Sequence, residues 1–225
     1  MQTPPVFGRL YKRGLDAARS NDRLTEWLWR VPVHHKRIPF TWDVTTLCLK
    51  KAIEANAPEG PFRFLDMGCG HLGLLGQYVK TAYSRAEVVS VDLYDEFVEN
   101  ARTNVRANGL DLDVHRSDLF ADVEGRFDLI TFNPPYKPDA GAPTLDFPAT
   151  TFSGPDGLDA SRGFLADAPA HLTERGRVLL GINCFFVPES ACREVIEGEG
   201  FDLRDVVTRR LNTARVFVLT PRPRN

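Results

Sequence analysis

The sequence contains no run of about 18 apolar residues, which is the least that a helix needs to cross a membrane. Its first residues, Met1–Pro5, hold no apolar core of the kind found in a secretory signal, so we expect no secretion. None of the four cysteines forms a C-x-x-C pair, and the histidines show no metal-ligand spacing. These absences predict reduced thiols, no bound metal and a cytoplasmic location.

A strong excess of charge of one sign is also missing, because the formal net charge is only −2. Residues 1–60 carry ten basic against six acidic residues, and the remainder carries eighteen against twenty-four. A basic segment can meet an acidic partner or nucleic acid, but a solvated helix face is its more ordinary explanation. The charge of the whole chain gives no support for a nucleic-acid binder, so we expect no nucleic-acid partner and no membrane partner.

What the sequence does contain is a glycine-rich turn at Arg63–Gly73, which reads RFLDMGCGHLG. Gly68, Gly70 and Gly73 have the spacing G-x-G-x-x-G, and the pattern predicts a helix from His71 onward. The first glycine permits the turn, the second lets a ligand approach bare backbone, and the third lets the helix pack close to the strand. Nicotinamide, flavin and S-adenosylmethionine (SAM) proteins all use this spacing, so other features must identify the cofactor.

Strands and helices alternate after residue 62, which predicts a parallel sheet. The expected strands are 62–67, 87–92, 111–116, 126–132, 177–183, 201–208 and 214–220, and the expected helices are 71–83, 94–107, 158–173 and 188–198. Residues 209–213 are too few for a helical crossover, so the last two strands form an antiparallel hairpin. A nicotinamide-binding domain would be parallel to its end. A mostly parallel seven-stranded sheet with a C-terminal antiparallel hairpin is the Rossmann-like α/β fold of class I SAM-dependent methyltransferases.

The segment before the sheet predicts a short helical cover. Helical patterns run over 5–18, 22–30 and 41–55, with cap signals at Asn21 or Asp22 and at Thr41. We therefore divide the chain into an N-terminal helical cover or lid, 1–58, and a SAM-binding catalytic domain, 59–225.

Three aspartates are candidates for the cofactor site. Asp92 ends the second expected strand, where an acid can accept both ribose hydroxyls of an adenosine, and Leu93 follows it. Asp118 follows the third strand, where it can accept the adenine amino group while Leu119 packs near the ring. Asp66 has two open roles, because it can orient the glycine turn or reach the ammonium of the ligand.

The motif Asn133-Pro134-Pro135-Tyr136 stands at the end of the fourth expected strand, where the ligand crevice of such sheets lies. An amide or aromatic amine is a poor nucleophile because its lone pair is delocalised. The side-chain carbonyl of Asn133 and the backbone carbonyl of Pro134 can accept its hydrogens and leave the nitrogen facing a methyl group. Two prolines hold this backbone rigidly, Pro135 adds no competing N–H, and Tyr136 can lie against a flat substrate group. Alignment of this kind can supply up to about 7–11 kcal/mol.

With these motifs the chain resembles the HemK/PrmC-like glutamine N5-methyltransferases over residues 60–220. The resemblance rests on Asp66–Gly70, Asp92, Asp118–Phe120, Asn133–Tyr136 and Ser153–Asp159. It implies SAM as cofactor, held by Asp66, Gly68, Gly70, Asp92, Leu93, Asp118, Leu119 and Asn133. It also implies that Asn133, Pro134 and Tyr136 hold the amide of a substrate glutamine, as family members that modify translation release factors do. Adenine-N6 methyltransferases share the N-P-P-Y sequence, so it does not fix the acceptor.

Residues 1–60 differ from the larger helical domain of the bacterial release-factor enzymes. Aromatic residues are dense there, among them Trp29, Phe40 and Trp42. These side chains either pack in a core or form a lid over the sulfonium, whose charge aromatic faces attract by about 0.5–2 kcal/mol. In the second case they bind substrate together with Pro135 and Tyr136, and a closed lid suits a small acceptor.

The sequence predicts an N-methyltransferase that acts on an amide or amine, either a release-factor glutamine or a small metabolite. One alternative keeps the fold but cyclises SAM itself to azetidine-2-carboxylate and releases methylthioadenosine. Another is a non-catalytic SAM-binding subunit, although an intact Asn133 argues against it. A nicotinamide enzyme is the remaining alternative.

Overall fold

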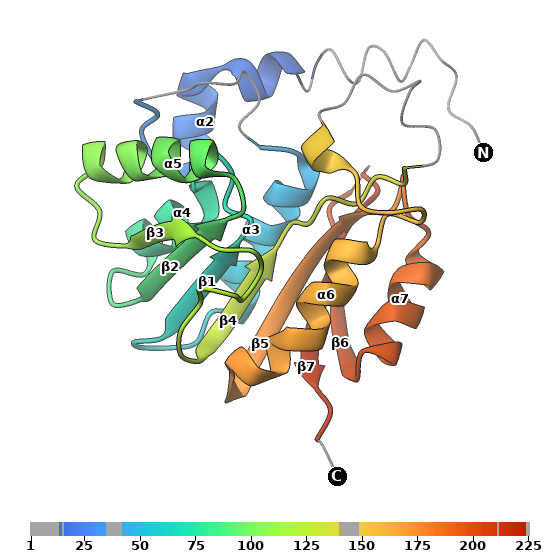
Figure 1. Ribbon diagram of the computed structural model, residues 1–225. Helices are drawn as coiled ribbons and strands as arrows, with labels where there is room; N and C mark the ends of the chain where they lie inside the picture. Colours follow the sequence, from blue (N-terminus) through green and yellow to red (C-terminus); the bar gives the residue numbers. More distant parts are fainter. Residues whose placement is uncertain (1–13, 15, 35–41, 140–148, 211, 224–225) are drawn as a thin grey trace.

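The computed structural model describes residues 14, 16–34, 42–139, 149–210 and 212–223 (Figure 1). Its sheet consists of β1 (Arg63–Met67), β2 (Glu87–Asp92), β3 (Asp113–Arg116), β4 (Phe127–Phe132), β5 (Leu172–Asn183), β6 (Phe201–Val207) and β7 (Ala214–Pro221). The strand order is β3-β2-β1-β4-β5-β7-β6, with β7 antiparallel to both neighbours and the other pairs parallel. The predicted Rossmann-like sheet with a C-terminal antiparallel hairpin is confirmed.

Helices cover both faces of the sheet. They are α2 (Asp22–Trp29), α3 (Val44–Asn56), α4 (Leu74–Ala82), α5 (Asp95–Ala107), α6 (Asp159–Asp167) and α7 (Glu189–Gly198). Figure 1 shows α6 and α7 in front of the sheet and α3 and α4 behind it. Helix α5 packs on β2 and β3, and Asn108, just beyond its end, donates a hydrogen bond to Gln77 of α4 over 2.7 Å.

The core follows from the alternation of side chains along each strand. Leu65 and Ile130 face the cluster that includes α6 and α7, whereas their neighbours Phe64 and Leu129 face the cluster that includes α3 and α4. Successive residues of a strand point to opposite faces, so a strand covered on both sides is apolar at nearly every position. Burial on two faces is therefore the reason why apolar residues are consecutive in β1 (Phe64, Leu65) and in β4 (Leu129, Ile130).

The N-terminal elements match the prediction in part. Asn21 caps α2 as expected, because its Oδ1 accepts the amide N–H of Leu24 at 3.1 Å. The cap of α3 is Asp43 and not Thr41, which lies outside the described residues. Helix α3 packs on β5 and β7. Within the described ranges no helix is both long enough and apolar enough to cross a bilayer.

Predicted boundaries were wrong at the start of α4 and at the junction of α6 with β5, each for a local reason. Helix α4 starts at Leu74 and not at His71, because Gly73 adopts a left-handed conformation with φ 58° and ends the turn. Helix α6 gives way to a short 3₁₀ helix, Ala168–His171, which contains Pro169 near its start, and β5 already begins at Leu172 and not at residue 177. The polar residues at the start of β5 concealed a strand that pairs with Phe127.

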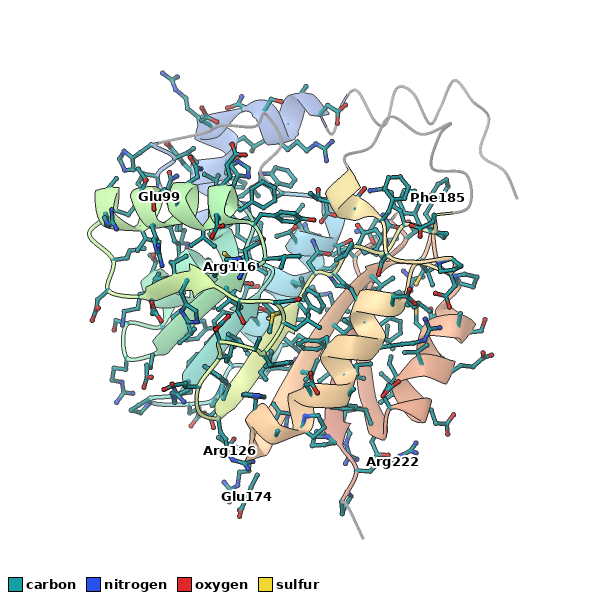
Figure 2. The ribbon with its side chains drawn as sticks, viewed as in Figure 1. Glu99, Arg116, Arg126, Glu174, Phe185 and Arg222 are labelled. Carbon is teal, nitrogen blue, oxygen red and sulfur yellow. The ribbon has the colours of Figure 1, made fainter. Side chains whose placement is uncertain are left out.

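The two edges of the sheet have different surroundings. In Figure 2, Arg126, Glu174 and Arg222 mark the edge where β4 and β5 begin and β7 ends. Phe185 marks the opposite edge, just beyond the end of β5. The carboxyl ends of β1, β2, β4 and β5 lie at this second edge, which is where ligands bind in sheets of this type.

Candidate active site

A cavity of about 480 Å³ lies at the carboxyl ends of β1, β2 and β4. It brings together most of the predicted site residues, namely Gly68, Gly70, Asp92, Leu93, Asp118, Leu119, Asn133, Pro134, Pro135 and Tyr136. We call Gly68, Gly70, Asp92, Asp118 and Leu119 the cofactor wall. We call Asn133–Lys137, together with Asp43, the acceptor wall. Cavities of this size hold small-molecule ligands and cofactors.

The glycine turn leaves room for a ligand at one position in particular. Gly68 and Gly70 have φ values of 66° and 65°, a conformation that L side chains rarely adopt. A Cβ at Gly70 would meet no atom within 4 Å, so its bare backbone is open. A Cβ at Gly68 would lie 3.2 Å from the ring of Phe132. The predicted role of the second glycine therefore fits the geometry.

The predicted role of the third glycine was wrong. A Cβ at Gly73 would touch only Ala101 of α5, at an ordinary 3.5 Å. The close approach of helix to strand occurs instead at Gly76, where a Cβ would collide with Oγ of Ser90 on β2. Gly73 is required for its left-handed backbone, and Gly76 is required for packing.

Asp92 organises the cofactor wall from the end of β2. Its Oδ2 accepts the amide N–H of Gly70 at 2.9 Å, and its Oδ1 accepts that of Tyr94 at 3.2 Å. Burial raises the pKa of this carboxyl, and the hydrogen bonds from Gly70 and Tyr94 oppose that rise. One side chain thus fixes the glycine turn, holds the backbone of Tyr94 just before α5 and lines the cavity.

The loop after β3 carries Asp118 and holds Leu119 in an unusual conformation. Leu119 has a φ of 48°, which is rare for a residue with a branched side chain. The hydroxyl of Ser117 donates to the carbonyl of Leu119 at 2.6 Å and accepts the amide N–H of Asp122 at 3.0 Å. These bonds hold the strained residue against the cavity.

Asp66 does not line the cavity. Its Oδ2 accepts the amide N–H of Gly76 at 3.2 Å, and its Oδ1 accepts the hydroxyl of Thr131 at 3.2 Å. Burial raises the pKa of this carboxyl to about 7. Of its two open roles, these bonds favour the structural one, because they tie α4 to β1 and β4 behind the glycine turn.

The acceptor wall contains a buried polar atom without a partner. Oδ1 of Asn133 is buried and has no hydrogen-bond partner among the described residues, although Asn133 lines the cavity. Leaving a buried acceptor unbonded costs about 1–3 kcal/mol, so such atoms are rare in native proteins and often mark a functional site. A ligand that donates a hydrogen bond from the cavity would supply the missing partner.

Tyr136 is held by residues that are distant in the sequence, at the start of α3. Its hydroxyl donates to Oδ2 of Asp43 at 2.8 Å and lies 3.4 Å from Oγ1 of Thr45. Burial and the charge of Asp43 raise the pKa of this phenol. Because Asp43 also caps α3 by accepting the amide N–H of Thr46 at 2.8 Å, the acceptor wall is tied to that helix.

The predicted aromatic lid is not assembled from the residues that the structure describes. Trp29 is fully buried in the core behind the sheet, and the indole N–H of Trp42 donates to Oγ1 of Thr25 at 3.0 Å. Neither lines the cavity. Phe40 lies outside the described residues, so its assignment stays a prediction.

Sequence reasoning missed several residues that line the cavity. Tyr94, the N-cap residue of α5, and Phe97 in its first turn follow Asp92, and their ring centroids lie 5.3 Å apart. Their position just after the strand-ending acid is a signal that could have found them. Asp43 and Lys137 also line the cavity. Nothing in the local sequence indicates that α3 starts against the acceptor wall.

The cavity offers the kinds of contact that SAM needs: hydrogen-bond acceptors, open backbone and apolar surface. Gly70 leaves uncovered backbone, Asp92 and Asp118 offer carboxylates, and Leu119 and Phe97 offer apolar surface. With the terminal hairpin, this arrangement defines a class I SAM-dependent methyltransferase. The chain belongs to the methyltransferase small domain family, whose model matches residues 40–199.

Relatives support this assignment. The chain is 31% identical over 219 residues to a release factor glutamine methyltransferase from Deinococcus radiodurans, covering 88% of this chain and 78% of that protein. It is 30% identical over 127 residues to a ribosomal RNA small subunit methyltransferase C from Haemophilus influenzae, covering 55% of this chain and 33% of that protein. A methyltransferase structure from Pyrococcus furiosus shares the fold, with a TM-score of 0.65, 19% identity and coverage of 93% and 96%.

Proposed function

We propose that this enzyme transfers the methyl group of SAM to an amide or amine nitrogen. The unbonded, buried Oδ1 of Asn133 at the cavity is the observation that carries this proposal. An oxygen in this position accepts an N–H of the acceptor and so orients the nitrogen. The same oxygen would gain nothing from a carbon acceptor that has no N–H to donate.

Each residue of the acceptor wall then has a role in alignment. The backbone carbonyl of Pro134 accepts a second N–H, and the two prolines keep both oxygens fixed. SAM supplies an electrophilic methyl group on a sulfonium with a good leaving group, so positioning is the main help that the protein gives. Asp43 holds Tyr136 in place through a 2.8 Å hydrogen bond, and the ring of Tyr136 forms the side of the acceptor site.

The acceptor is either a glutamine side chain in a protein or a small molecule. The relative from Deinococcus radiodurans is named for release factor glutamine, which supports the first. The relative from Haemophilus influenzae is named for ribosomal RNA, so the test also includes an RNA as possible acceptor. We further propose a cytoplasmic location, which the four free cysteines support.

The test measures the products formed from SAM with three probes, which are a glutamine-containing peptide, free L-glutamine and a short adenine-containing RNA. We expect S-adenosylhomocysteine and an N-methylated peptide or glutamine. Asn133→Ala should lower turnover about 100-fold or more, the scale of losing one preorganised contact in the transition state. Its affinity for SAM, measured by calorimetry, should stay within about threefold of the parent value, a difference of less than 1 kcal/mol.

Asn56→Ala is the matched control, because Asn56 lies on α3 and pairs with Arg177 away from the cavity. Methylthioadenosine in place of S-adenosylhomocysteine would contradict the proposal and favour cyclisation of SAM. SAM binding without any product would favour a non-catalytic subunit. Unchanged turnover in Asn133→Ala would remove that side chain from the mechanism.

A further inference from the structure

Lys137 is a buried cation in the acceptor wall. It follows Tyr136, lines the cavity and is only 7% exposed. Its backbone is fixed on both sides, because its N–H donates to the carbonyl of Thr151 at 3.0 Å and its carbonyl accepts the N–H of Ser153 at 2.9 Å. The side chain therefore projects from a rigid segment, as a binding group must.

The surroundings of the Lys137 ammonium combine aromatic faces with charges of both signs. Nζ lies 5.3 Å from the ring centre of Phe186 and 5.9 Å from that of Tyr136. Phe186 in turn packs edge-on against the exposed Phe185, which lies just beyond the end of β5 (Figure 2). Asp43 favours the charged form and Arg19 opposes it.

We propose that Lys137 binds an anionic group of the methyl acceptor, a carboxylate or a phosphate, and so favours acceptors that carry such a group beside the nitrogen. This inference rests on the proposed transfer of a methyl group to a nitrogen held by Asn133. It adds a second contact point to the same wall: Asn133 orients the nitrogen, and Lys137 fixes the far end of the molecule.

The electrostatic environment of the Lys137 ammonium favours an anion as its ligand. Burial lowers the pKa of Lys137 to about 8, so the surroundings as a whole disfavour the charged form even with Asp43 nearby. An anion bound in the cavity would stabilise that form through a charge-assisted hydrogen bond. The binding of such an acceptor should therefore weaken as pH rises above the pKa of Lys137, because the ammonium is then lost.

Calorimetry on the full chain saturated with S-adenosylhomocysteine tests the inference with two pairs of probes. N-acetyl-glutamine is compared with neutral N-acetyl-glutaminamide, and adenosine 5′-monophosphate is compared with adenosine. We expect the anionic member of one pair to bind about tenfold tighter or more, which corresponds to about 1.4 kcal/mol. The pair that shows the preference identifies a carboxylate or a phosphate as the anion.

In Lys137→Met the preference should fall below about threefold, that is, below 1 kcal/mol, while affinity for S-adenosylhomocysteine and the melting temperature stay close to the parent values. Lys137→Arg should retain part of the preference because it keeps the positive charge. Lys51→Met is the control, because Lys51 lies outside the cavity on α3. Its preference should equal that of the parent.

The inference is overturned if no anionic probe binds, if both members of each pair bind equally, or if the preference persists in Lys137→Met. This readout does not depend on methyl transfer. A failed preference in an enzyme that forms S-adenosylhomocysteine therefore sinks only the role of Lys137. Formation of methylthioadenosine from SAM sinks the proposed function itself.

Discussion

The cofactor wall and the acceptor wall meet in one cavity but are held in different ways. In the cofactor wall, each carboxylate oxygen of Asp92 already accepts one amide N–H, from Gly70 or from Tyr94, and keeps a lone pair for a ligand. In the acceptor wall, Oδ1 of Asn133 is buried and has no partner among the described residues. The carboxylate of the first wall is thus held by hydrogen bonds within the protein, whereas the amide oxygen of the second has none from the described residues.

The contacts that hold the two walls also differ in sequence separation. Asp92 reaches residues 22 and 2 positions away, while the bond from Tyr136 to Asp43 spans 93 positions. The cofactor wall is thus built by consecutive βα units. The acceptor wall depends on the docking of α3, so changes in the segment before the sheet can alter acceptor binding without touching the cofactor.

The largest effect is expected behind the cofactor wall, at Asp66. Its pKa is raised to about 7 in the folded protein, above the ordinary value of 3.8 that applies when unfolded. The unfolded chain therefore releases this proton first, and the group lowers stability progressively as pH rises from about 4 to 7. The full cost amounts to up to about 4 kcal/mol.

Asp66→Asn should remove this loss and keep an acceptor for Gly76 or Thr131. Urea unfolding at a series of pH values should show a weaker decline of unfolding free energy between pH 4 and 7 in the variant than in the parent. Identical slopes in the two proteins would contradict the raised pKa of Asp66. They would mean that this buried carboxyl behind the cofactor wall does not lower stability as pH rises.

An intermediate effect is expected at Asp92. Asp92→Ala leaves the N–H groups of Gly70 and Tyr94 without their acceptor, which costs about 1–3 kcal/mol, and it removes a carboxylate from the cavity. We expect SAM affinity, measured by calorimetry, to fall about 10- to 100-fold.

Asp95→Ala serves as control, because Asp95 begins α5 three residues later and its side chain is 87% exposed. Its SAM affinity should match that of the parent. Normal SAM affinity in Asp92→Ala would show that the cofactor wall does not need its central carboxylate.

The smallest effect is expected at Tyr136. Tyr136→Phe removes the hydroxyl that Asp43 accepts at 2.8 Å but keeps the ring. Loss of one such bond is worth about 0.5–1.5 kcal/mol, so kcat should fall about two- to tenfold while SAM affinity stays unchanged.

A double-mutant cycle with Asp43→Asn sharpens this point, because the two changes should be less than additive if the bond itself matters. A fall in SAM affinity equal to the fall in kcat would show that the two walls are coupled and not separate.

Local sequence patterns were enough to predict much of this molecule. The alternation of apolar strands and helices identifies the sheet, and the short connection between the last two strands requires a hairpin, because five residues cannot form a crossover. The positions of Gly70, Asp92, Asn133 and Tyr136 at strand ends also follow, since the carboxyl ends of parallel strands share one edge.

Only the tertiary structure decided which side chains meet across long separations. The partnership of Asp43 with Tyr136 depends on how α3 docks against the sheet. The burial of Trp29 and Trp42 away from the cavity, and the place of Lys137 within it, likewise depend on contacts with elements distant in the sequence. Local propensity and periodicity report which face of an element is apolar, but they carry no information on which distant element covers it. The sequence by itself therefore determined the fold and the binding edge, and packing determined the shape of the acceptor wall.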